Sequence, residues 1–172
     1  MNRNSLRTAS RRVVLCALLA AAAVVLQVAM SFLPNIEPVS LLVLVYALAF
    51  GRDVFYIIFT FVLLEGLVFG FHLWWVSYWY VWPLWAAAVL LIGRGREKPP
   101  LLWAVASGAF GLSFGALCAL PYLVGGPWAA FSYWVAGIPF DLLHCGGNFV
   151  LALVLEQPLY RMLTLMRKKM SF

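Results

Sequence analysis

The order of apolar and polar residues divides the chain into six hydrophobic stretches. Prolines, glycines and charged residues interrupt the sequence and leave apolar runs at about 13–33, 38–51, 54–71, 77–92, 101–124 and 137–157. Because a helix needs roughly 20 apolar residues to cross a bilayer, the pattern predicts an all-α membrane protein, a compact bundle of six transmembrane helices. The second run is short, as is typical of a helix packed inside a bundle or of a locally thinned membrane.

Composition leads to the same class of protein. Of the 172 residues, 65% are hydrophobic and 10% are charged, values that a soluble domain cannot accommodate on its surface. The length suits one domain, residues 1–172, with no soluble domain added. The first apolar run follows several arginines and is similar to a signal peptide. It is long enough to span, and more spans follow, so we expect a retained first helix.

Basic residues occur only at alternate ends of the predicted spans. They lie at 3–12, 52, 94–98 and 161–169, whereas the loops at 33–38, 71–77 and 124–136 contain no Lys or Arg. The positive-inside rule then predicts that both termini are cytoplasmic in the plasma membrane of a prokaryote. The predicted outer half contains three acids, Glu37, Glu65 and Asp141, and no positive charge. The net charge of +6 therefore reflects topology rather than nucleic-acid binding.

Two of these acids lie within predicted spans. Glu65 is about six residues from the outer end of the third span, and Asp141 lies near the outer start of the sixth. A carboxylate in the hydrocarbon region is costly unless it is paired, hydrated or protonated, so each is a functional candidate. The alternatives are a hydrogen bond between helices for Glu65, and a helix-dipole interaction after Pro139 for Asp141.

The sixth span also presents a polar stripe. Asp141, His144 and Asn148 are spaced i, i+3 and i+7, which places them on one face of a helix. The stripe could join helices by hydrogen bonds or form one wall of a ligand site. The adjacent pair Gly146-Gly147 would let a backbone or a ligand approach closely.

Aromatic residues are concentrated at residues 71–82, in or beside a predicted outer loop. Part of this cluster suits an aromatic belt at the membrane interface. The remainder suits a flat heteroaromatic or cationic ligand, which aromatic faces bind by stacking and cation–π attraction. Together with Trp134 of the last outer loop and Glu37 of the turn at 33–38, which is either a lid or a connector, the ligand-binding candidates here are His72, Trp75, Tyr78, Trp79 and Trp82.

No sequence motif indicates an enzyme or a resident cofactor. The chain has no nucleotide-binding loop, no His-Glu-x-x-His motif and no nucleophile elbow. The cysteines, all within apolar runs, are expected to be small buried hydrophobes. A metal centre could be built from His72, Asp141, His144 and Cys145, but their spacing is not diagnostic, so we predict no metal site.

Three segments carry a resemblance to a known family. They are Ala17-Leu-Leu-Ala-Ala21, Pro34-Asn-Ile-Glu-Pro-Val-Ser-Leu-Leu42 and Gly137-Ile-Pro-Phe-Asp-Leu-Leu-His-Cys-Gly-Gly-Asn-Phe-Val150. With them, the chain resembles an S-component, the substrate-binding subunit of an energy-coupling factor (ECF) vitamin transporter. The resemblance implies that the protein has no ATPase of its own and works with an EcfT-type membrane coupling subunit and two cytoplasmic ATPases. It would bind a vitamin outside, topple in the membrane and release the vitamin inside.

In that family, small residues four apart on the first helix form the docking face for the coupling subunit. Ala17 and Ala21 match this spacing, although ordinary alanine packing is the alternative.

The charge pattern narrows the expected substrate. An outer half with acids and no Lys or Arg disfavours anionic vitamins such as folate, pantothenate or biotin. A neutral or cationic heteroaromatic is favoured, such as thiamine and its precursors, vitamin B6 amines or deazapurine bases. Cobalamin stays open because His144 and Cys145 could approach cobalt. The competing classes are a membrane structural or assembly protein that holds a partner through its outer aromatics, and an intramembrane metal-dependent enzyme.

Overall fold

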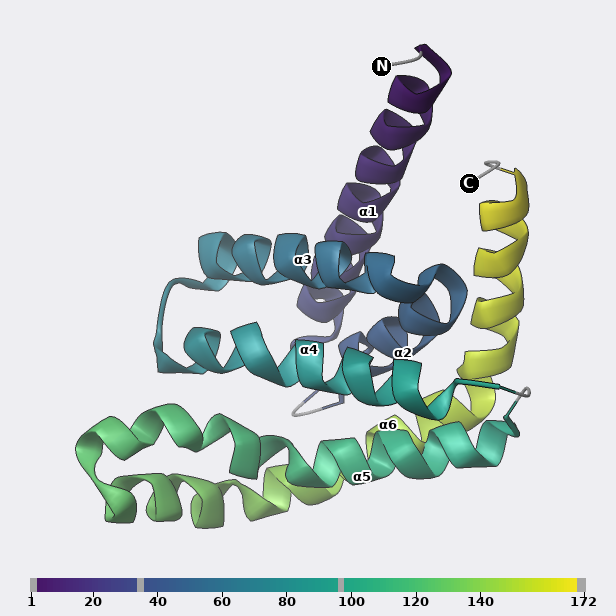
Figure 1. The fold of residues 1–172 in the computed structure, drawn as a ribbon. Helices are drawn as coiled ribbons and strands as arrows, with labels where there is room; N and C mark the ends of the chain where they lie inside the picture. Colours follow the sequence, from purple (N-terminus) through teal and green to yellow (C-terminus); the bar gives the residue numbers. More distant parts are fainter. Residues whose placement is uncertain (1–2, 34–35, 96–97, 170–172) are drawn as a thin grey trace.

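The computed structural model describes residues 3–33, 36–95 and 98–169, and this part of the chain is helical (Figure 1). The α-helices are α1 (Arg3–Met30), α2 (Val39–Phe50), α3 (Val54–Phe69), α4 (Leu73–Ile92), α5 (Pro100–Cys118) and α6 (Pro127–Lys169). Two short 3-10 helices, η1 (Gly51–Asp53) and η2 (Leu120–Gly125), connect them. The all-α class is confirmed for the described residues.

Five helical stretches in the described part of the chain are long and apolar enough to cross a membrane, so the protein is a multi-pass membrane protein. Separate spans at 38–51 and 54–71 are not confirmed. With 12 and 16 residues, α2 and α3 are each shorter than a bilayer core of about 30 Å requires at about 1.5 Å per residue. They reach spanning length only as one stretch of 31 residues, Val39–Phe69, that runs through η1.

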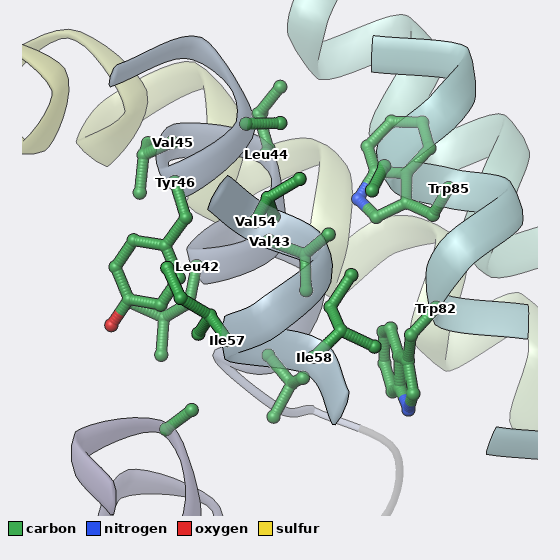
Figure 2. Packing of buried hydrophobic residues seen from close by; sticks show 14 of the residues in the cluster. Leu42, Val43, Leu44, Val45, Tyr46, Val54, Ile57, Ile58, Trp82 and Trp85 are labelled. Carbon is green, nitrogen blue, oxygen red and sulfur yellow. The ribbon is translucent and has the colours of Figure 1, made fainter. Parts of the chain in front are cut away.

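Helix α2 forms the centre of the hydrophobic core. All of its residues except Leu48 are buried, and the polar Ser40 is among them. Figure 2 shows side chains of α2 packed beside Ile58 of α3 and Trp82 and Trp85 of α4. Of the two explanations for the short run, the structure agrees with a helix packed inside the bundle, because nearly all residues of α2 are covered by protein.

Helix α6 is much longer than the run predicted at 137–157. It begins at Pro127 and continues for 43 residues through Pro139 and Pro158, so most of the predicted loop at 124–136 is helix. Proline and glycine are read as breakers in a sequence, but packing against neighbouring helices lets a membrane helix continue past them. Figure 1 shows the first part of α6 beside α5 and its last part turning away toward the C-terminus.

The predicted aromatic loop at 71–77 is also mostly helix, because α4 begins at Leu73. In a helix, successive side chains point in different directions, so the rings of this segment cannot all face one ligand.

Basic residues of α1 and α6 meet the turn between α2 and α3. Arg12 Nε donates to Asp53 Oδ2 at 2.8 Å, and Arg12 Nη2 also contacts the Asp53 carboxylate. Arg167 Nη1 donates to the carbonyl oxygen of Ala49 at 2.7 Å. The basic ends of the first and last helices therefore gather at one end of the bundle.

Candidate functional site

A cavity of about 430 Å³ lies where α1, α3, α4, α5 and α6 meet the segment before α2. This volume is in the range of small-molecule sites. Four of the predicted ligand-binding residues line it: Glu37, Glu65, Tyr78 and His144. We call it the acidic cavity, and its lining is completed by Gln27, Met30, Ser31, Leu33, Ile36, Phe69, Trp74 and Phe114.

Glu65 of α3 is fully buried beside this cavity, and only one of its two carboxyl oxygens has a hydrogen-bond partner among the described residues. Its Oε2 accepts a hydrogen bond from Gln27 Nε2 of α1 at 3.2 Å. Its Oε1 and the Gln27 Oε1 are buried without a hydrogen-bond partner among the described residues. A buried oxygen without a partner costs free energy that a donor on a ligand would recover. Gln27 and Glu65 thus leave two unpaired hydrogen-bond acceptor oxygens beside the cavity.

Glu37 and His144 form a second polar group on the wall of the acidic cavity. His144 Nε2 of α6 lies 3.5 Å from Glu37 Oε1 and 3.3 Å from Ser40 Oγ of α2. The pKa of Glu37 is raised to about 8, chiefly because its carboxyl is removed from water and secondarily because Glu65 is near. At neutral pH, Glu37 is therefore mostly protonated, and a bound cation would favour its ionised form.

Aromatic rings form the remaining wall of the acidic cavity. Trp74 and Tyr78 are four residues apart on α4, so they share one face, and their ring centroids are 5.0 Å apart. Phe114 of α5 meets the His144 ring edge to face at 4.8 Å. Such faces can stack on a flat ligand or attract a cation.

The sequence predictions missed Gln27, Trp74 and Phe114 as lining residues. Only for Trp74 was a signal present, in its four-residue spacing from Tyr78 on a helix. The contributions of α1 and α5 depend on how these helices pack.

Three of the predicted tryptophans do not line the acidic cavity. Trp75 Nε1 donates to the Val62 carbonyl oxygen at 2.7 Å and thereby joins α4 to α3. The Trp79 ring packs edge to face on Phe59 and Trp75. Trp82 is fully buried in the hydrophobic core. All three contribute to packing between helices.

His72 and Trp134 also lie away from this cavity. His72 is exposed at the N-terminus of α4, and Trp134 is 39% exposed on the outer surface of α6. Among the described residues no group of three His, Cys, Asp or Glu side chains could hold a metal ion, so the alternative centre of His72, Asp141, His144 and Cys145 is not assembled.

Of the polar stripe on α6, only His144 reaches the acidic cavity. Asp141 Oδ1 accepts a hydrogen bond from the Gly115 backbone N–H at 2.9 Å, and Asn148 Nδ2 donates to the Ser107 carbonyl oxygen at 3.4 Å. Because α6 begins at Pro127, Asp141 lies well inside this helix and not at the start of a helix as predicted. These two side chains join α6 to α5, which was one of the two interpretations of the stripe.

The contact between α5 and α6, here named the helix seam, depends on small residues of α5. A Cβ added at Gly111 would lie 2.8 Å from the His144 backbone, and one at Gly108 would lie 3.3 Å from the Cys145 carbonyl oxygen. At Gly115 it would overlap the Asp141 carboxylate. Glycines on this face let the two backbones approach closely. The seam thereby positions His144 against the acidic cavity.

No family model matches the chain, and comparison with curated proteins and with solved structures finds no match either.

Proposed function

We propose that this chain is the S-component of an ECF-type importer, and that it captures a small neutral or cationic heteroaromatic molecule in the acidic cavity. The observation that carries the proposal is the lining of this cavity. It combines two carboxyl groups, Glu37 and Glu65, with the rings of Trp74, Tyr78 and Phe114, and none of the described residues in it is Lys or Arg. A micronutrient with a flat ring and a basic or donor nitrogen has the complementary chemistry.

The electrostatics favour such a cargo over an anion. A carboxylate ligand would lie against Glu65, whose Oε1 already lacks a donor, and the described lining residues include no Lys or Arg that would offset the repulsion. A donor nitrogen instead satisfies that oxygen. Thiamine-like, vitamin B6-like and deazapurine-like molecules remain the substrate classes that we propose.

Docking to a coupling subunit is the second part of the proposal. Ala17 and Ala21 are exposed on the described part of α1, and so are the neighbouring Leu18 and Ala22. An exposed face with small residues four apart allows another membrane helix to approach closely. In the proposed transporter this partner is the membrane coupling subunit, which joins two cytoplasmic ATPases, and both termini face the cytoplasm of a prokaryotic cell.

The test is purification of the full chain from its native host, followed by mass spectrometry of the small molecules released on denaturation and of the copurified proteins. The proposal expects a heteroaromatic micronutrient in near-equimolar amount, together with a membrane coupling subunit and ATPases. In the variant Ala17→Leu/Ala21→Leu, the coupling proteins should be lost and the small molecule retained. Copurification of an unrelated assembly partner without a small molecule would favour a structural protein instead.

A further inference from the structure

A second cavity, of about 500 Å³, lies beside the acidic cavity. The rings of Trp74, Tyr78 and Phe114 line both cavities, so the two cavities are adjacent. The second cavity is otherwise mainly apolar, and its other lining residues are Gly115, Cys118, Tyr133, Ala136, Gly137, Phe140 and Asp141.

Asp141 brings an acceptor oxygen to this second cavity. The side chain is 3% exposed, and its hydrogen bond across the helix seam uses only Oδ1. Its Oδ2 is buried and has no hydrogen-bond partner among the described residues. The seam therefore accounts for one oxygen of this carboxylate and leaves the other, in a residue that lines the second cavity, without a donor among the described residues.

The two cavities share three aromatic rings, and each cavity also has at least one acid in its lining. Glu37 and Glu65 line the acidic cavity, Asp141 lines the second cavity, and no Lys or Arg of the described part of the chain lines either one. A ligand that fills the acidic cavity alone would leave the Asp141 oxygen unpaired. A longer ligand, with a donor at each end and a flat apolar middle, matches both acids and the shared rings.

We propose that both cavities hold one substrate, an elongated aromatic molecule with a basic nitrogen at each end. One nitrogen binds at Glu65 and the other at Asp141, and the flat middle lies against Trp74, Tyr78 and Phe114. This inference rests on the proposed function and narrows its substrate class.

The test compares two probes that differ only in a second aminomethyl group. One is biphenyl with a single aminomethyl group, and the other is biphenyl with an aminomethyl group on each ring. Calorimetric titration of the purified full chain in lipid nanodiscs should give a diamine that binds at least about tenfold more tightly than the monoamine. Asp141→Asn keeps an acceptor for the Gly115 N–H, and it should bring the affinities of the diamine and the monoamine to within about twofold of each other.

A second variant leaves the helix seam untouched. A Cβ added at Gly137, which lines the second cavity, meets no atom within 4 Å, so Gly137→Leu adds side-chain volume there without a clash at its first carbon. This variant should also abolish the gain of the diamine. Gly146→Leu is the matched control, because Gly146 is equally open and lines neither cavity. It should retain the full gain.

Two results would overturn the two-cavity site: a diamine that binds no more tightly than the monoamine to the unaltered protein, or a gain that persists in both Asp141→Asn and Gly137→Leu. A different result would contradict the proposed function. If monoamine affinity is unchanged by Glu65→Gln, the acidic cavity itself is not the binding site. If the monoamine requires Glu65 but the diamine gains nothing, only the two-cavity inference is lost.

Discussion

The helix seam and the acidic cavity both bury polar side chains, but they satisfy them differently. In the seam, Asp141 and Asn148 bond to backbone groups of α5, which glycines bring within reach. In the acidic cavity, Glu65 is paired on one oxygen only, and the His144 Nδ1 is buried without a partner among the described residues. Asp141 Oδ2 and Asn148 Oδ1 of the seam likewise have no partner among the described residues, so the two regions differ in what the bonded atoms meet: backbone groups of α5 in the seam, and the Gln27 side chain in the cavity.

The largest effect is expected from placing a larger side chain in the helix seam. In Gly111→Val, the new side chain would meet the His144 backbone at 2.8 Å, and a helix backbone cannot move away cheaply. Such overpacking typically costs about 1–3 kcal/mol or more, so we expect a large loss of folded monodisperse protein. Thermal unfolding in detergent measures it. Gly146→Val is the control, because a Cβ there meets no atom within 4 Å, and equal stability of both variants would contradict the role of the seam.

The second effect is loss of ligand binding without loss of folding. Glu65→Gln keeps the size of the side chain and removes the negative charge that the proposed cargo neutralises. Charge-assisted hydrogen bonds contribute about 1.5–3 kcal/mol, so affinity for the copurified small molecule should fall about 10- to 100-fold. Calorimetric titration measures it.

Glu156→Gln is the matched control for that prediction. Glu156 is also a buried carboxyl, but it lines a different cavity, near Lys98 and Arg161. Its replacement should leave the affinity unchanged. If both variants weaken binding equally, the loss reflects the bundle as a whole and not the acidic cavity.

A smaller effect separates cavity tryptophans from packing tryptophans. Trp74→Ala removes a ring that lines the acidic cavity, and Trp79→Ala removes one that packs on Phe59 and Trp75 outside it. A lost cation–π or stacking contact of about 1–2 kcal/mol should weaken binding about 5- to 30-fold in the first variant only. Ligand titration and thermal unfolding of both proteins measure the difference. Stronger weakening by Trp79→Ala would reverse the assignment.

The smallest effect is a pH dependence of binding. Because the pKa of Glu37 in the free protein is about 8, this carboxyl is mostly neutral at pH 6 and ionised at pH 9. A permanently charged cation favours the ionised form, so its affinity should rise as the pH increases through 8, and binding should release a proton below that pH. Titrations in buffers of different ionisation enthalpy measure this proton release. A slope that is unchanged in Glu37→Gln would assign the effect to another group.

Sequence reasoning found the membrane class, most of the apolar runs and part of the lining of the acidic cavity. It found Glu37, Glu65, Tyr78 and His144, because a polar residue in an apolar span has few uses besides pairing and binding. It did not separate Trp75, Trp79 and Trp82 from the lining residues, because it grouped the aromatic residues at 71–82 as one cluster in or beside a loop, whereas residues 73–82 lie on α4. On a helix, the rotation of each residue decides which ring faces a cavity, and loop composition does not contain that information.

The sequence by itself determined that this protein lies in a lipid bilayer, that it is helical, and that basic and acidic residues are separated along the chain. These properties follow from the hydropathy and the charge of each segment. Only the tertiary structure decided that α2 is buried at the centre, that α6 continues past Pro139, and that Gln27 meets Glu65. Those outcomes depend on how closely helices approach and on which faces meet, and both arise from packing between segments distant in the chain.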